Sequence, residues 1–143
     1  MKRTLLTLAV AVSLAVPAAA LACDGAGHQQ ASMEPKKMTV AELAALSKDK
    51  KVTPVDANGE KTRTSSGVIP GAVLLTSSSQ YAVTELPTSK DAKLVFYCAN
   101  EKCSASKQAA KRALENGYTD VAFMPEGIKG WVASGQPTQK PNS

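Results

Sequence analysis

Residues 94–104 read LVFYCANEKCS, and this stretch decides the fold of the chain. Its first four residues form an apolar run of strand formers, and a strand that is apolar on both faces suits the centre of a parallel sheet. Cys98 follows at once, and a helix is predicted from about Ser104 to Asn116, with Gly117 as its stop. We therefore expect Cys98 at the carboxyl end of a central strand, where α/β proteins place reactive groups.

The segments around this stretch alternate between strand and helix patterns. Thr39 and Glu42 have the spacing of a capping box and predict a short helix that runs to about Ser47. The other predicted elements are strands at 51–56, 68–75 and 118–124, a polar loop at 57–67, a weak helix at 80–85 and a closing helix at 128–134. This alternation predicts an α/β fold with a parallel sheet and helices on both faces.

The first 22 residues have the pattern of a secretory signal peptide. A basic start precedes an apolar run at 5–16 that is too short to span a bilayer comfortably, and A-x-A cleavage sites end at Ala20 and Ala22. We therefore expect an exported protein, either periplasmic or secreted. Cleavage after Ala22 would leave Cys23 first, so a lipoprotein anchored to the membrane through Cys23 is the alternative.

The rest of the chain is long enough for one domain with a single core. Residues 23–37 are predicted to be a flexible tether, because they hold mostly Gly, Ala, Gln, Ser, Pro and Lys. The predicted domain covers 38–138, and 139–143 form a flexible tail. The single histidine, His28, falls in the tether and is expected to be incidental, since it and Cys23 lack the further ligands that a metal site needs.

The charge of the chain gives no reason to propose a nucleic-acid partner. Removing Lys2 and Arg3 with the signal peptide lowers the formal net charge from +5 to about +3. The remaining basic residues are scattered, without the aromatic-studded basic stripe that nucleic-acid binding favours. A membrane is expected as a partner only if Cys23 is lipidated.

The loop that begins at Cys98 can activate its sulfur. Backbone amides of residues 99–104 can turn inward around that sulfur, and the helix that follows contributes partial positive charge at its N-terminus. Both effects favour the thiolate, which could take up a sulfane sulfur and hold it as a persulfide. Lys102 would add positive charge, whereas Glu101 would oppose it unless it points outward. The competing interpretation is that Cys98 is only a buried small residue at a strand end.

Four segments together resemble the rhodanese family. The strand and loop at 94–104 resemble the family's active-site segment, in which a catalytic cysteine opens a six-residue loop before a helix. The sequence GVIPGA at 67–72 is similar to the family's GHIPGA, with Val68 where His is usual. Val55-Asp56 matches the start of a VDxR segment, and EGIKGW at 126–131 is similar to the GGI-x-x-W ending.

The resemblance implies a fold, a reaction and a set of site residues. The fold is a parallel five-stranded sheet flanked by helices, and the reaction is sulfur transfer from a small donor to a thiol acceptor through a persulfide, with no metal or organic cofactor. Cys98 would be the catalytic residue. The active-site loop would comprise Ala99, Asn100, Glu101, Lys102, Cys103 and Ser104.

The departures from the family pattern bear on the substrate. Asn58 stands where the VDxR segment has Arg, and no obvious acidic partner follows it, so we expect the neighbouring loops to be tied differently. Thiosulfate is a less certain donor, because Lys102 is the only cation within the loop for a dianion. Asp56 is expected at most to orient the loop by accepting amide hydrogen bonds.

The presence of Cys103 leaves two types of reaction possible for the loop. If the loop brings its Cα within about 7 Å of that of Cys98, a disulfide can form. The protein would then be a thiol-disulfide or persulfide-reducing factor, since a resolving cysteine releases such adducts. Otherwise Cys103 only fills space at the helix start.

Two further functions can be compared with the sequence of the same loop. A phosphatase related to this fold would need a longer loop that ends in Arg, and no Arg follows Cys98 until Arg112. A non-catalytic binding module fits the changed early motif but not the intact Cys98. Gly127 and Trp131 are predicted to be structural, the first permitting a tight turn and the second sealing the base of the fold.

Overall fold

The computed structural model describes residues 34–141, which form a five-stranded parallel sheet in the order β1-β5-β4-β2-β3. The strands are β1 (Lys36–Lys37), β2 (Thr53–Asp56), β3 (Val73–Leu74), β4 (Leu94–Tyr97) and β5 (Val121–Met124). The predicted five-stranded parallel sheet is confirmed. The predicted signal peptide at 1–22, Cys23 and His28 lie outside the described residues.

Strand β4 lies at the centre of the sheet, and its side chains are buried on both faces. All four of its residues are buried, and its backbone pairs with β5 on one side and β2 on the other. In this register Tyr97 lies opposite Asp56 and Met124. The carboxyl ends of three buried strands therefore meet at the residue that precedes Cys98.

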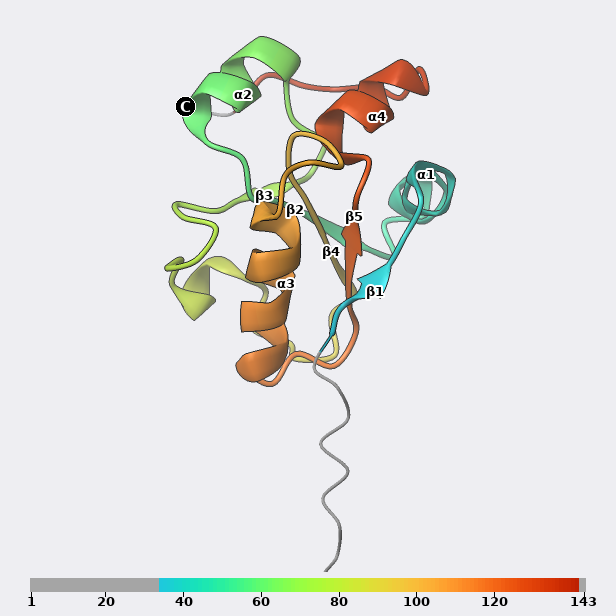
Figure 1. Cartoon of the computed structure of the whole chain (residues 1–143). Helices are drawn as coiled ribbons and strands as arrows, with labels where there is room; N and C mark the ends of the chain where they lie inside the picture. Colours follow the sequence, from blue (N-terminus) through green and yellow to red (C-terminus); the bar gives the residue numbers. More distant parts are fainter. Residues whose placement is uncertain (1–33, 142–143) are drawn as a thin grey trace, which may run out of the picture.

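Helices cover both faces of the sheet, as predicted. They are α1 (Val40–Lys48), α2 (Glu60–Ser66), the 3-10 turn η1 (Val83–Glu85), α3 (Ala105–Glu115) and α4 (Gly127–Ala133). The small residues of α3 pack on one face of the sheet, whereas α1 and α4 pack on the other. Figure 1 shows α2 and α4 together at the end of the sheet where the strands finish.

Helix α2 was not predicted, since residues 57–67 read as a polar loop. It has no buried residue, so no apolar periodicity marks it in the sequence, and only the glycines at its two ends delimit it. The strand predicted at 68–75 is shorter than expected. A turn in which the Ala72 amide donates to the Ile69 carbonyl delays it to Val73–Leu74.

The ordered domain extends beyond both predicted limits. Lys36 and Lys37 fall in the predicted tether but belong to the sheet as strand β1. Gln139 falls in the predicted tail but pairs with Val68. Both pairings are made by backbone hydrogen bonds, which leave no side-chain pattern to recognise. Two lysines also suit an exposed sheet edge, where charge discourages pairing with another chain.

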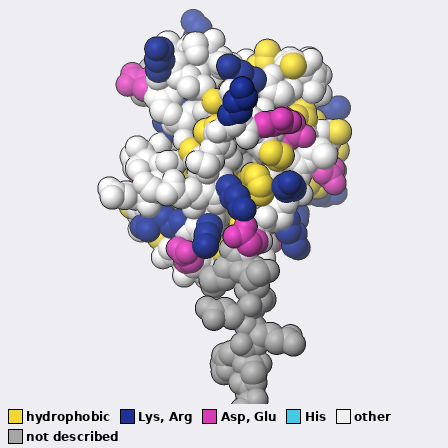
Figure 2. All heavy atoms as spheres, viewed as in Figure 1, with side chains coloured by type: hydrophobic (Ala, Val, Ile, Leu, Met, Phe, Trp, Pro, Cys, Tyr) yellow, Lys and Arg dark blue, Asp and Glu magenta, His cyan; other side chains and the backbone are white. Residues whose placement is uncertain are grey.

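The surface is mixed in charge on the face that Figure 2 shows. Lysine and arginine side chains are interspersed there with aspartate and glutamate, and they form no continuous basic band. Within residues 34–141, no helix combines the length and apolar character that crossing a membrane requires.

Candidate active site

Cys98 occupies the position that the sequence predicts for it. It directly follows β4 at the carboxyl end of the sheet, its residue is 1 % exposed, and the loop that it opens leads into α3. Helix α3 is eleven residues long, so its N-terminus carries the partial positive charge of a full-length helix. The cysteine therefore lies between a buried strand end and a helix start, an environment that stabilises a thiolate.

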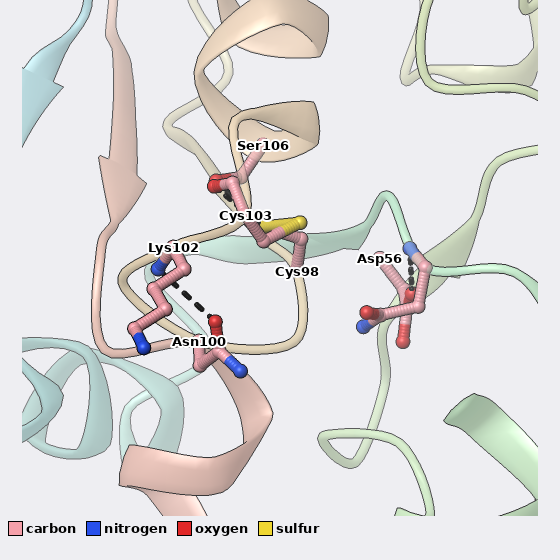
Figure 3. The surroundings of a disulfide bond; sticks show 7 residues. Asp56, Cys98, Asn100, Lys102, Cys103 and Ser106 are labelled. Atoms are coloured by element: carbon pink, nitrogen blue, oxygen red, sulfur yellow. Dashed lines mark hydrogen bonds between the residues drawn. A yellow bond between two sulfur atoms is a disulfide. The ribbon is translucent and has the colours of Figure 1, made fainter.

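The sulfur of Cys98 contacts two residues farther along the chain. It forms a disulfide with Cys103, whose Cα lies 6.3 Å from that of Cys98. It also lies 3.1 Å from the Cys103 carbonyl oxygen and 3.3 Å from Oγ of Ser106 (Figure 3). The structure thus gives Cys103 a disulfide partner, which the sequence had left open.

Ser106 is a site residue that the sequence analysis missed. It lies in the first turn of α3 and is 1 % exposed, next to the buried alanines of that helix. Its hydroxyl can donate to a thiolate or to a persulfide at Cys98, because a hydroxyl hydrogen rotates toward the available acceptor. A serine on the apolar face of a helix was the one available signal, since such a group needs a buried partner.

Asn100 determines the shape of the loop. Its carbonyl oxygen accepts the amide of Cys103 at 2.9 Å, and its side-chain Oδ1 accepts the amide of Lys102 at 3.0 Å. These bonds fold the loop back so that Cys103 reaches Cys98. They also correct the expectation that the amides of 99–104 all turn toward the sulfur, because two of them donate to Asn100 instead.

The charged residues of the loop face outward. Glu101 and Lys102 are exposed, and Figure 3 shows the Lys102 side chain directed away from the disulfide. With Glu126 and Lys129 they line an open depression of about 530 Å³ on the outer side of the loop. The expected contribution of Lys102 to the charge at the sulfur is therefore not seen in this structure.

Helix α4 supports the loop from outside the sheet. The amides of Ile128 and Lys129 donate to the carbonyl oxygens of Cys98 at 2.8 Å and Ala99 at 3.1 Å. Gly127 permits this approach, since it has a φ of +63° and a Cβ built on it would lie 2.5 Å from the Cys98 carbonyl oxygen. The glycine predicted to permit a turn therefore also leaves space for the backbone of the loop.

Trp131 closes the other side of α4. It is 2 % exposed, and its Nε1 donates to the carbonyl oxygen of Pro137 at 2.7 Å. The indole packs in the core cluster that contains Val95 and Tyr97. Its predicted structural role is consistent with this burial, and the bond to Pro137 holds the chain that leads back to Val68.

Asp56 ends β2 beside the site and is fully buried. Its Oδ1 accepts the amide of Asn58 at 2.6 Å and Nε of Arg63 at 3.3 Å. Within residues 34–141 the Asp56 carboxylate accepts hydrogen bonds from these two partners and from no amide of the loop 98–104, so its predicted role in orienting that loop stays a prediction. Burial raises the pKa of the Tyr97 hydroxyl, and the nearby Asp56 carboxylate raises it further. The Tyr97 hydroxyl oxygen accepts a hydrogen bond from the Ile69 amide.

Arg63 connects the ends of two strands. Its Nη2 donates to the carbonyl oxygens of Asp56 at 3.0 Å and Leu75 at 2.8 Å, while its Nε pairs with the Asp56 carboxylate. Asn58 stands at the position where Arg was expected, and its own Nδ2 is buried without a partner among the described residues. Arg63 was not predicted as a residue of the site, because it lies on the unpredicted helix α2.

Arg63→Met is expected to lower the free energy of unfolding by about 3–5 kcal/mol, because it leaves the Asp56 carboxylate buried without its cation. Urea unfolding followed by circular dichroism measures the change. Lys61→Met is the matched control, since Lys61 lies exposed on the same helix and its replacement should change stability by no more than about 0.5 kcal/mol. Equal effects of the two substitutions would show that the Asp56–Arg63 pair is not structurally important.

Within residues 34–141, no group of three or more His, Cys, Asp or Glu side chains is placed to hold a metal ion. The reactive groups that the structure brings together at the site are the Cys98 sulfur, the Ser106 hydroxyl and the Cys103 sulfur. This set suits reactions that make and break bonds between sulfur atoms.

Comparison with known families and structures identifies the same architecture. The family model of the rhodanese-like domain matches residues 39–134. A protein of unknown function from Rhodopseudomonas palustris CGA009, described as a possible tyrosine phosphatase, is 27 % identical, with a TM-score of 0.61 over 73 % of this chain and 85 % of that one. No curated protein matches the chain.

Two enzymes share the fold at lower identity. Thiosulfate sulfurtransferase from Pseudomonas aeruginosa is 20 % identical, with a TM-score of 0.64 over 76 % of this chain and 21 % of that one. The 3-mercaptopyruvate sulfotransferase SseA from Escherichia coli is 19 % identical, with a TM-score of 0.62 over 76 % of this chain and 52 % of that one. Each of these enzymes is longer than the region it shares with this chain.

Proposed function

Because this chain belongs to the rhodanese-like family, we propose that it is a sulfurtransferase that carries sulfane sulfur as a persulfide on Cys98. The observation that carries the proposal is the position of this cysteine. It ends the central strand, lies beside the N-terminus of α3, and has the Ser106 hydroxyl 3.3 Å from its sulfur. These features stabilise the thiolate before the transfer and the persulfide anion after it.

The reaction consists of two exchanges at sulfur. The Cys98 thiolate attacks the outer sulfur of the donor, a bond forms between the two sulfur atoms, and the rest of the donor leaves with the electron pair. A thiol acceptor then attacks the outer sulfur of the persulfide and restores the Cys98 thiolate. The acceptor is a small molecule or a protein, and neither exchange requires a metal or an organic cofactor.

We propose a small persulfide ahead of thiosulfate as the donor. Thiosulfate is a dianion and is bound best where fixed cations face its oxygens. Lys102 is the one cation in the loop sequence 98–104, and it is exposed and directed away from the sulfur. A persulfide donor needs less charge compensation at this site.

A thiol-disulfide redox factor is the second candidate function, and the Cys98–Cys103 disulfide is the observation that favours it. In that case the protein would exchange disulfides with other thiols without carrying a sulfane sulfur. A non-catalytic binding module remains the third candidate, although it would give no reason for two cysteines to meet at the end of the central strand.

A phosphatase is not proposed, although one similar structure is described as a possible tyrosine phosphatase. The first arginine after Cys98 is Arg112, in the last turn of α3. Its Nε donates to the carbonyl oxygen of Tyr81 at 3.2 Å, and its guanidinium lies over the Tyr81 ring. This arginine is therefore committed to packing α3 and is not placed in the cysteine loop.

We propose that the mature protein is exported. The proposal rests on the signal-peptide pattern of residues 1–22, and lipidation of Cys23 remains the alternative route to a membrane. An oxidising compartment also agrees with a disulfide between Cys98 and Cys103, since such bonds persist outside the reducing cytosol.

Mass spectrometry of the mature protein tests the proposed function. The protein is reduced, freed of reductant and treated with one equivalent of glutathione persulfide, and its peptides are compared before and after treatment. The mass of one added sulfur on the Cys98 peptide, at any time after mixing, supports the sulfurtransferase. If the persulfide adds no sulfur and releases no hydrosulfide, but glutathione disulfide oxidises the pair to the Cys98–Cys103 disulfide and leaves as two glutathione thiols, the redox factor is supported. No reaction with either reagent supports the binding module.

A further inference from the structure

Cys103 is placed to react with whatever Cys98 carries. The two sulfur atoms are bonded in this structure, with the Cα atoms 6.3 Å apart, which lies within the range of ordinary disulfides. In a Cys98 persulfide, the outer sulfur is bonded to the same Sγ atom that Cys103 binds here. A persulfide and this disulfide are therefore alternative states of one sulfur atom.

We propose that Cys103 is a resolving cysteine that discharges the Cys98 persulfide and releases hydrosulfide, so that the protein is a persulfide reductase. This inference rests on the proposed function, because it needs a sulfane sulfur on Cys98. It replaces the attack of an external acceptor on the outer sulfur by an attack of Cys103 on the inner sulfur, Sγ of Cys98. The external partner would then be a dithiol reductant and not a sulfur acceptor.

The proposed steps balance in atoms and electrons. The Cys98 thiolate first takes the outer sulfur of a persulfide donor, and the donor leaves as its thiolate. The Cys103 thiolate then attacks Sγ of Cys98, a bond forms between the two cysteines, and the bond to the outer sulfur breaks so that hydrosulfide leaves. The two thiols together lose two electrons, and the sulfane sulfur gains them.

The backbone of the loop keeps Cys103 close to its target. Asn100 holds the amide of Cys103 through its carbonyl oxygen and the amide of Lys102 through its side chain. Helix α4 holds the other end of the loop by donating to the carbonyls of Cys98 and Ala99. Attack by Cys103 is therefore intramolecular within a short constrained loop, which raises its rate over that of a free thiol.

The difference in exposure between the two cysteines gives the direction of the reduction that follows. Cys98 is 1 % exposed, whereas Cys103 is only partly buried. An external dithiol therefore meets the sulfur of Cys103 first and forms a mixed disulfide there. Cys98 leaves as the thiolate that the α3 N-terminus and Ser106 stabilise, and the second thiol of the reductant frees Cys103.

The test measures hydrosulfide and persulfide in the same samples. Wild-type protein, Cys103→Ser and Cys98→Ser are each prepared in a Cys23→Ser background, reduced, freed of reductant and given one equivalent of glutathione persulfide. We expect the wild type to release about one hydrosulfide per chain and to end as the Cys98–Cys103 disulfide. We expect Cys103→Ser to keep the added sulfur on Cys98 and to release at least about tenfold less hydrosulfide until a thiol is added.

The outcomes separate the two proposals. If both proteins keep the sulfur on Cys98 equally, the resolving cysteine is wrong and the sulfurtransferase stands. If neither protein gains sulfur nor releases more hydrosulfide than Cys98→Ser, which measures the spontaneous reaction, both proposals fail. Cys103→Ala repeats the comparison in case the serine disturbs the loop, and circular dichroism verifies that each variant is folded.

Discussion

Cys98→Ser is expected to lower the rate of sulfur loading by about a thousandfold or more, to the level of the spontaneous reaction. The hydroxyl that replaces the thiol is not ionised at neutral pH and does not form a stable bond with a sulfane sulfur. Serine is close in size to cysteine, so the buried position between β4 and α3 is preserved. Loading is measured as the sum of the hydrosulfide released and the added mass of one sulfur on the peptide that contains residue 98.

Cys103→Ser is the matched control for this prediction, because it removes the other cysteine of the same loop. We expect it to load sulfur at a rate similar to that of the wild type, since the attacking thiolate is intact. If the added sulfur appears on the Cys103 peptide of the Cys98→Ser variant, the carrier is Cys103 and not Cys98. In that case the buried cysteine would be a structural residue at a strand end.

Gly127→Ala is expected to lower the free energy of unfolding by about 3 kcal/mol, through a left-handed backbone conformation and a collision with the loop. The added Cβ would lie 2.5–2.7 Å from backbone atoms of Cys98, Ala99 and Asn100, so that either α4 or the loop must move. We also expect sulfur loading to slow at least about tenfold, since the displaced loop no longer holds Cys98 as β4 and α3 place it.

Gly135→Ala separates the two contributions. Gly135 also has a positive φ, +71°, but nothing lies within 4 Å of a Cβ added to it. Its substitution should cost only the conformational penalty, about 1 kcal/mol, and should leave sulfur loading unchanged. If both substitutions reduce stability equally and neither affects loading, the contact between Gly127 and the loop has no functional importance.

The sequence predicted the parts of the site that are local in the chain. An apolar run, a cysteine and a helix follow one another within residues 94–116, so the position of Cys98 could be read directly from them. The capping box of Thr39 and Glu42 is equally local, and it is present in the structure with both of its hydrogen bonds. Patterns of this kind depend on neighbours that are fixed by covalent spacing.

The parts that were missed depend on contacts between segments far apart in the sequence. Arg63 reaches Leu75 from a helix without an apolar face. Gly127 lies against Cys98, although the cysteine loop, α3 and β5 separate the two residues in the sequence. Ser106 looked like one more polar residue at a helix start. Its place on the apolar face of the helix indicates burial, but its position beside the sulfur follows from the way α3 packs on the sheet.

The two-residue strand β1 has a mechanical consequence for a chain held by its N-terminal end. Tension applied there meets the exposed ion pair of Glu34 with Lys107 of α3, and then the pairing of β1 with β5 and the bond from the Met38 amide to the Phe123 carbonyl. These few interactions at the sheet edge can be lost while the pairing of β4 with β5 and β2 stays intact. Detachment of β1 therefore lengthens the chain ahead of α1 and leaves in place the strands that position the cysteine loop.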